Sequence, residues 1–383
     1  MDHRTASSRP NRRRASGGAA VVAASLLLSA CAAQPETITS PALSPSAAPA
    51  PSPTADALEP VAPSGDPVDV TTGLEAPWSV AFVGETAIVS ERDSGRILEL
   101  ADDGSTREVT TVEGVVTGGE GGLLGLTVDD DERLYVYSTG SDGNRIERYS
   151  LTGEPGALGV DDPETILDGI PSARTHNGGR LAIGPDGLLY ASVGDAGNRD
   201  APQDPDALGG KILRMTLDGG VPDDNPIEGS LVYSLGHRNV QGLAWAEDGT
   251  MFATEFGQDT WDELNLITPG ANYGWPVVEG VVGRAEFTDP LQQWNPDDAS
   301  PSGLAVVGGT LFVANLRGEV LRSVPLADTT SSTDYLSGEF GRLRDVVEAP
   351  DGSLWVVTNN TDGRGEPTDG DDRILRLPLS PAP

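Results

Sequence analysis

A histidine and an aspartate bracket one glycine-rich stretch of this chain and could take part in proton transfer. His176 and Asp195 are the ends of "HNGGRLAIGPDGLLYASVGD", in which His176 stands before a strand-like run and Asp195 follows the next one. A neutral imidazole can accept a proton near pH 7, so His176 is a candidate general base. A lone histidine is also common as a hydrogen-bonded structural residue, and His176 alone does not decide between these roles.

Arginines recur at the same place in other parts of the sequence. They stand where strand-like segments begin or end, together with one histidine and one asparagine: His237, Arg238, Asn239, Arg317, Arg342 and Arg344. Guanidinium groups pair bidentately with carboxylates, so their recurrence in an acidic chain suggests one strongly anionic ligand that they share. Each arginine taken singly could instead be a surface residue that pairs with a neighbouring carboxylate.

The stretch "EFGQDTWDELNLITPGANYGWP", residues 255–276, has the ligand types of a calcium site. It combines carboxylates, loop carbonyl groups and a tyrosine within a short distance along the chain. Hard cations such as Ca²⁺ prefer oxygen ligands of this kind. Short acidic clusters are also frequent in acidic proteins, so the stretch is equally compatible with a solvated surface.

The elements that must position these residues repeat along the chain. Units such as "WSVAFVGETAIVSERDSGRILEL" and "SGLAVVGGTLFVANLRGEVLRSVPL" contain a strand, a tight turn, a second alternating strand, a loop and a third strand. Six such units predict an all-β fold, a six-bladed β-propeller. We expect residues 67–74 to form the outer strand of the last blade, and insertions between blades, notably 196–210 and 276–299, to lie on one face and build the site.

The first part of the chain has the composition of a secretion signal and a tether. Five arginines precede an apolar run from Ala19 to Leu28, and "LSAC" ends at Cys31, the single cysteine of the chain. We therefore predict a lipoprotein signal peptide at 1–30, lipidation of Cys31, a Pro/Ala/Ser-rich linker at 31–66 and the propeller at 67–383. An ordinary signal peptide with an incidental cysteine is the alternative. Either reading places the protein outside the cytoplasm, and the first anchors it to the cell membrane.

Composition limits the other partners. The formal net charge is −34, with 48 glycines and 30 prolines among 383 residues. Such a charge repels nucleic acid and anionic lipid headgroups, so we expect no nucleic-acid partner and membrane contact only through the lipid anchor.

Several motifs together are similar to one enzyme family. "EGGLLGL", "HNGGRLAIGPDGLLYASVGD", "GKILRM", "LGHRNVQGLAW", "DELNLITPGANYGWP" and "GRLRDVV" resemble, in order, the soluble quinoprotein glucose and aldose sugar (glucose/sorbosone) dehydrogenases over residues 67–378. The resemblance implies a six-bladed propeller that uses pyrroloquinoline quinone (PQQ) and Ca²⁺. It also implies oxidation of aldose sugars at C1 to lactones, with hydride transfer to PQQ and an electron acceptor that the sequence does not identify.

The resemblance also assigns roles to individual positions. His176 would be the general base, Asp195 would hold the sugar or the base, and Arg238 would polarise the accepting carbonyl group. The residues implied in cofactor binding are Glu120, Arg238, Asn239, Arg317, Arg342 and Arg344. The main-chain oxygens of Gly257 and Gln258 would bind the catalytic calcium, and Glu263 and Tyr273 would contribute to a second, structural calcium.

Four positions depart from the family pattern. Glu120 stands in place of a glutamine, Arg317 in place of a lysine, Gln258 in place of a proline, and Thr175 in place of an aspartate before the base. The last change argues against specificity for glucose itself. Two other functions stay open: a calcium-dependent lactonase on a propeller, which the arginines disfavour, and a non-catalytic sugar-binding or adhesion propeller, which His176 and Arg238 disfavour.

Overall fold

A computed structural model describes residues 58–382 of the chain. The predicted signal peptide, Cys31 and most of the predicted linker lie outside the described residues. Within residues 58–382, strands β1 to β27 form almost all of the regular structure, and the single 3-10 helix is η1 (Ala201–Gln203). No helix of the described part is long and apolar enough to span a membrane.

The strands form six antiparallel blades, each with four strands or more. From the inside outward, the first blade contains β3 (Pro77–Val83), β4 (Thr86–Glu91), β5 (Arg96–Leu100) and β6 (Thr106–Thr111). The second blade contains β7 (Leu123–Val128), β8 (Arg133–Gly140) and β9 (Gly143–Thr152), and β9 pairs with both β10 (Gly159–Val160) and β11 (Glu164–Ile170). The third blade contains β12 (Leu181–Ile183), β13 (Leu189–Val193), β14 (Lys211–Met215) and β15 (Val232–Leu235). The fourth blade contains β16 (Val240–Trp245), β17 (Met251–Glu255), β18 (Asp262–Ile267) and β19 (Gln292–Trp294). The fifth blade contains β20 (Pro301–Val307), β21 (Thr310–Asn315), β22 (Leu321–Pro325) and β23 (Thr333–Tyr335). The sixth blade contains β24 (Leu343–Glu348), β25 (Leu354–Thr358), β26 (Arg373–Leu377) and β2 (Val68–Thr72).

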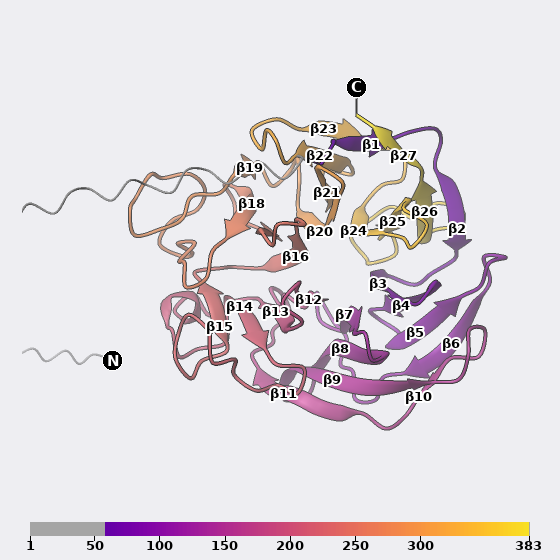
Figure 1. The fold of residues 1–383 in the computed structure, drawn as a ribbon, viewed down its shortest axis with the longest axis horizontal. Coiled ribbons are helices and arrows are strands. Elements are labelled where there is room, and N and C mark those ends of the chain that lie inside the picture. Colours follow the sequence, from indigo (N-terminus) through magenta and orange to yellow (C-terminus); the bar gives the residue numbers. More distant parts are fainter. Residues whose placement is uncertain (1–57, 383) are drawn as a thin grey trace, which may run out of the picture. The chain divides into compact units, whose positions relative to one another are not determined.

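The blades are arranged in a ring around their innermost strands (Figure 1). Each of the strands β3, β7, β12, β16, β20 and β24 contacts the next, and β24 returns to β3. The predicted six-bladed β-propeller is therefore confirmed.

The ring closes with a strand from the beginning of the described chain. β2 pairs antiparallel with β26, with Val68 opposite Arg376 and Thr72 opposite Arg373, as predicted for residues 67–74. A second pair lies outside this blade, because β1 (Val61–Pro63) pairs with β27 (Leu379–Pro381). Strand pairing therefore starts at Val61, earlier than the boundary at residue 67 that the change in composition predicted.

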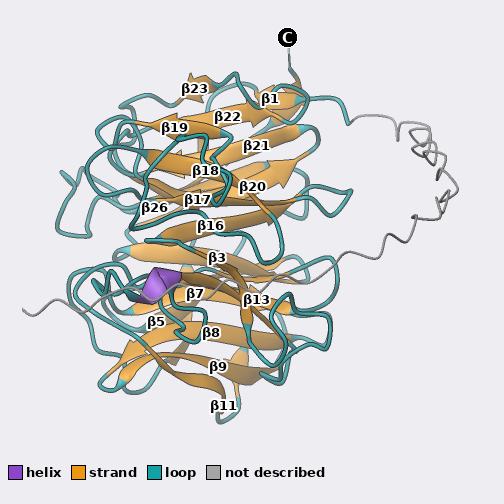
Figure 2. Cartoon of the chain, turned by 90° about the vertical axis from the view of Figure 1, so that its left-hand side faces the viewer, coloured by secondary structure: helices purple, strands orange, loops and turns teal. Residues whose placement is uncertain are grey.

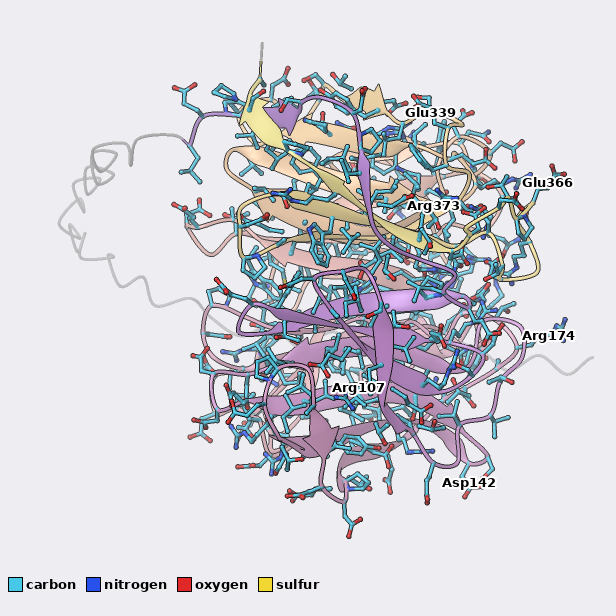
Figure 3. All side chains as sticks on the ribbon, turned by 90° about the vertical axis from the view of Figure 1, so that its right-hand side faces the viewer. Arg107, Asp142, Arg174, Glu339, Glu366 and Arg373 are labelled. Carbon is cyan, nitrogen blue, oxygen red and sulfur yellow. The ribbon has the colours of Figure 1, made fainter. Side chains whose placement is uncertain are left out.

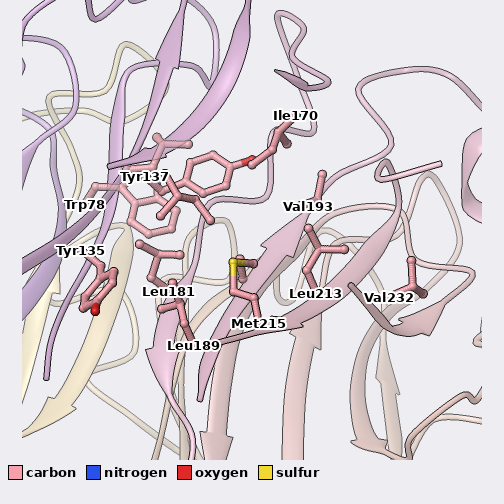
Figure 4. Packing of buried hydrophobic residues seen from close by; sticks show 13 residues of the cluster. Trp78, Tyr135, Tyr137, Ile170, Leu181, Leu189, Val193, Leu213, Met215 and Val232 are labelled. Atoms are coloured by element: carbon pink, nitrogen blue, oxygen red, sulfur yellow. The ribbon is translucent and has the colours of Figure 1, made fainter. Parts of the chain in front are cut away.

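Alternating apolar residues pack between neighbouring blades. The largest cluster joins the first three blades and includes Trp78, Tyr135, Tyr137, Leu181 and Met215 (Figure 4). Burial of each large apolar side chain contributes about 1.5–3 kcal/mol. Contacts of this kind fix the angle between blades and hence the positions of the loops at the ends of the strands.

A buried ion pair crosses the centre of the ring. Arg180, just before β12, pairs with Asp345 of β24 at 3.0 Å, and its Nε donates to the Gln241 carbonyl at 2.8 Å. The guanidinium also lies over the Trp78 ring, 4.4 Å from its centroid. Residues of four blades thereby meet at the centre, which ties the inner strands together beneath the loops.

The insertion 196–210 lies within a blade rather than between two blades. It joins β13 to β14 and contains η1, which lies at one face of the propeller (Figure 2). That face also carries the segment before β12, where His176 is found, so the insertion lies at the site as expected.

Candidate active site

His176 has a strained backbone that several contacts hold in place. Its φ is +61°, in the left-handed region that residues with a Cβ adopt rarely. The main-chain N–H donates to Glu120 Oε2 at 2.7 Å, and Nδ1 lies 2.7 Å from Asp195 Oδ1. Such strain persists only where the surroundings over-determine the conformation, which is typical of functional sites.

Gly194 leaves the space that the His176 backbone needs. A Cβ added at Gly194 would lie 1.9 Å from the His176 carbonyl oxygen, which must then move. We expect Gly194→Ala to displace the base, to lower kcat at least tenfold and to lower the free energy of unfolding by about 1–3 kcal/mol. Steady-state kinetics and thermal unfolding check this. Gly159→Ala is the control, because Gly159, like Gly194, has no positive φ, and a Cβ there would meet only the Thr152 hydroxyl oxygen, at 3.1 Å; equal activity in both variants would contradict the prediction.

Asp195 is held as a carboxylate beside the imidazole. Burial disfavours its charge, but hydrogen bonds from His176, from the Gly197 N–H and from Trp275 outweigh burial and keep its pKa below the usual value. The Trp275 indole Nε1 donates to Oδ2 at 2.9 Å, while Oδ1 faces His176. An ionised Asp195 stabilises the protonated imidazole and leaves Nε2 of His176 for a substrate.

Arg238 and Asn239 lie beside the base, whereas His237 has a structural role. The Asn239 side-chain oxygen accepts from Gly178 N at 3.1 Å, and Arg238 Nη1 donates to the Phe256 carbonyl at 3.1 Å. Arg238 Nε is buried without a hydrogen-bond partner, and burial lowers the pKa of this arginine. Both ring nitrogens of His237 are engaged, by Glu255 and by a serine, so this histidine is not available as a base.

Three guanidinium groups gather at one buried aspartate on the neighbouring side of the site, two of them at its carboxylate and one at its main-chain carbonyl group. Arg342 Nη2 lies 3.1 Å from Asp362 Oδ2, Arg344 Nη2 lies 4.0 Å from it, and Arg92 Nη2 donates to the Asp362 carbonyl at 3.3 Å. Burial, together with the charges of Arg92 and Arg342, lowers the pKa of Arg344 to about 9. Arg92 also pairs with Asp93 at 2.7 Å, whereas Arg342 and Arg344 have only Asp362 between them among the described carboxylates, and Arg342 Nε is buried without a partner. This donor set fits a ligand with several carboxylates, such as PQQ.

Glu120 links the base to the arginines, while Arg317 lies apart from them. Glu120 Oε2 accepts from His176 N, and Oε1 pairs with Arg364 at 3.2 Å. The Arg317 side chain is 59% exposed and pairs with Asp297 at 2.5 Å. Within residues 58–382 no ion pair or hydrogen bond joins Arg317 to the Arg342–Arg344 cluster, so the structure does not bring this member of the predicted set together with the others.

The segment expected to bind the catalytic calcium presents free carbonyl groups. The N–H of Gly257 donates to Asp262 at 2.8 Å and that of Gln258 donates to Glu279 at 2.6 Å. These bonds turn both N–H groups toward the protein, and in the described part of the chain no hydrogen bond reaches either carbonyl oxygen. Neutral oxygens of this kind fit Ca²⁺, with further ligands supplied by the cofactor or by water.

The second expected calcium site is less complete. Glu263 Oε1 accepts from Gly280 N at 2.7 Å, and burial and the charge of Glu255 raise its pKa. The Tyr273 hydroxyl donates to the Leu266 carbonyl at 2.6 Å. A cavity of about 10 Å³, close to the lower limit for one water molecule, adjoins Glu255, Glu263 and Tyr273. The described residues contain no group of three or more His, Cys, Asp or Glu placed to hold a metal ion.

Lys211 holds the insertion that borders the site. Its buried Nζ donates to the carbonyl oxygens of Ala201 at 2.6 Å, Pro202 at 3.2 Å and Gly209 at 2.8 Å, and burial lowers its pKa to about 8. We expect Lys211→Met to lower the free energy of unfolding by about 1–3 kcal/mol, because three carbonyl groups lose this donor. Urea unfolding measures the change, and a variant as stable as the parent protein would refute this role.

The structure adds residues that the sequence patterns did not single out. Arg92 directly follows β4 and Arg317 comes two residues after β21, so an arginine just after the second strand of a blade was a usable signal. Trp275 belongs to a motif in which the sequence pointed to possible calcium ligands and gave the tryptophan no role. Asp362 follows β25, the second strand of the sixth blade, and nothing in the sequence separates it from other loop aspartates.

The chain is similar over most of its length to characterised dehydrogenases. Residues 74–375 match the family described as glucose/sorbosone dehydrogenase. The solved structure of a PQQ-bound aldose sugar dehydrogenase from Streptomyces coelicolor is 47% identical, with a TM-score of 0.78, over 83% of this chain and 100% of that one. Aldose sugar dehydrogenase YliI of Escherichia coli is 29% identical over 76% of this chain and 89% of its own length. Quinoprotein glucose dehydrogenase B of Acinetobacter calcoaceticus is 28% identical over 79% of this chain and 86% of its own. With its six blades and its site residues in family order, this chain belongs to the glucose/sorbosone dehydrogenase family.

Proposed function

We propose that this protein is a PQQ-dependent dehydrogenase that oxidises aldose sugars at C1 to lactones. The observation that carries the proposal is the pairing of His176 with Asp195 at 2.7 Å next to a buried arginine cluster short of carboxylates. A base and a polyanion site side by side are what quinone-dependent oxidation of an alcohol needs.

Each residue of the site has a task that follows from its contacts. Nδ1 of His176 faces Asp195, so Nε2 accepts the proton of the C1 hydroxyl group. Arg342 and Arg344 bind carboxylates of the cofactor, and the free Nε of Arg238 is the donor available to its carbonyl oxygen. Bound PQQ supplies a quinone that takes up the C1 hydrogen with its electron pair, and a sugar that loses this hydride and the hydroxyl proton becomes a lactone.

Calcium and the anchoring of the protein belong to the same proposal. The carbonyl oxygens of Gly257 and Gln258 would hold the catalytic Ca²⁺, and Glu263 would contribute to a second ion. Cys31 carries a lipid that holds the catalytic domain at the outer face of the membrane. Electrons leave the site to an acceptor that neither the residues nor the contacts of the site identify.

The proposal is tested by dye reduction with purified protein, a panel of aldoses, Ca²⁺, and PQQ either added or omitted. PQQ-dependent turnover that a calcium chelator abolishes supports the whole assignment. If no sugar is oxidised and absorbance titration detects no PQQ binding, the arginine cluster serves a different ligand and a non-catalytic propeller becomes the better description.

A further inference from the structure

Nearly every arginine of this acidic protein is neutralised by a nearby carboxylate. Within residues 58–382, all arginines have an Asp or Glu oxygen within 4.0 Å except Arg174, Arg199 and Arg238. These three lie around His176. Arg238 already has a role at the cofactor, whereas Arg174 and Arg199 are exposed and have none.

Arg199 is tied to the base through two intermediate side chains. Its guanidinium lies 4.4 Å from the centroid of the Trp275 ring, and the indole N–H of Trp275 donates to Asp195 at 2.9 Å. Asp195 in turn contacts His176 at 2.7 Å. Arg199 also donates to the side-chain oxygen of Gln258, so it bridges the insertion 196–210 and the segment expected to bind calcium.

Arg174 stands on the other side of the base, two residues before it. Its carbonyl oxygen accepts the Glu120 N–H at 2.8 Å, and its Cγ lies 2.6 Å from the position that a Cβ would occupy at Gly119. The side chain extends from this anchored backbone into solvent (Figure 3). Thr175, between Arg174 and the base, is uncharged.

The two carboxylates that contact His176 are engaged with other groups. Glu120 binds the His176 N–H and Arg364, and Asp195 binds His176, Trp275 and the Gly197 N–H. Two cations therefore lack an ion-pair partner at the edge of the site, in a chain whose formal net charge of −34 repels anions elsewhere. A guanidinium left in this state is a ready partner for a carboxylate or phosphate.

We infer that Arg174 and Arg199 select an aldose that carries an anionic group, a hexuronic acid or a sugar phosphate, over the neutral sugar. This inference rests on the proposed oxidation at C1 and specifies its substrate class. The sugar presents C1 to His176, and its anionic substituent pairs with one guanidinium or both.

The test compares kcat/KM of the PQQ- and Ca²⁺-loaded protein for matched sugars. Glucuronic acid and glucose 6-phosphate are each compared with glucose, and galacturonic acid with galactose. We expect at least one anionic class to exceed its neutral counterpart about tenfold or more, and the two classes identify which anion is preferred. The advantage should shrink between 20 mM and 300 mM salt, because exposed charges are screened.

Variants decide whether these arginines are responsible. Arg174→Gln combined with Arg199→Gln should lower the ratio of anionic to neutral kcat/KM about tenfold or more. The control variant combines Arg376→Gln with Arg373→Gln. These arginines pair with Asp351 and Asp69 away from the base, so the control should leave the ratio of anionic to neutral kcat/KM unchanged. Because the result is a ratio within one protein sample, partial misfolding does not mimic it.

The possible failures can be told apart. Turnover of neutral aldoses with no preference for anionic ones, or a ratio unchanged in the double variant, overturns the inference and leaves the proposed function intact. If no aldose is oxidised by protein that has bound PQQ, the proposed function fails and the substrate class fails with it.

Discussion

Replacing His176 by alanine is expected to lower kcat about 10²–10⁴-fold, the range that a positioned general base contributes. Nδ1 of this histidine is committed to Asp195 at 2.7 Å, so Nε2 is the atom that takes the substrate proton. Cofactor binding should persist, because within residues 58–382 no hydrogen bond or ion pair joins His176 directly to Arg342 or Arg344; the link runs through Glu120, Arg364 and Asp362. Stopped-flow reduction of bound PQQ by the sugar measures the chemical step directly.

Two further variants separate the base from the architecture around it. His176→Asn keeps a polar group close to Asp195 but lacks a base, so it should be as slow as the alanine variant. His237→Asn removes a histidine whose nitrogens are both engaged away from the substrate, and should affect stability more than the pH dependence of kcat. Full turnover by either His176 variant, with PQQ bound, would show that another group accepts the proton.

Replacing both Arg342 and Arg344 by glutamine is expected to raise the Kd for PQQ about 10²–10⁴-fold. A hydrogen bond to a charged group contributes about 1.5–3 kcal/mol, and two are removed. The side chains of Arg342 and Arg344 are 10% and 3% exposed and are held by Asp362, Gln241 and Asn359, so they are already arranged for a ligand. Absorbance titration with PQQ gives the Kd.

The same double variant leaves Asp362 buried with fewer partners, so it should also be less stable. Arg322→Gln is the matched control. The Arg322 side chain is 8% exposed and pairs with Asp334 of its own blade, which is a different blade from that of Arg342 and Arg344. That variant should lose stability without losing PQQ affinity. Unchanged affinity in the Arg342/Arg344 variant would place the cofactor elsewhere on the propeller.

Local patterns in the sequence were sufficient for the fold. Alternation of apolar residues, tight turns and the repeat of the unit are properties of neighbouring residues, and they predicted six blades. The closing strand β2 followed from the topology of a closed ring. The start of strand pairing at Val61 was not predictable, because β1 lies in a proline-rich stretch and pairs with β27 at the far end of the chain.

The sequence by itself also determined the types of group at the site: a histidine and an aspartate close along the chain, and arginines at matching positions in the repeats. Only the tertiary structure decided which of them meet. Arg92 and Arg317 both stand just after the second strand of their blades, yet Arg92 reaches Asp362 while Arg317 pairs with Asp297 at the surface. Closure of the ring brings Glu120, His176 and Arg364 together across the chain, because loops of different blades converge on one face. Partners so distant in sequence leave no local pattern. For the same reason, only the tertiary structure shows that the two arginines near the base, Arg174 and Arg199, have no carboxylate as an ion-pair partner.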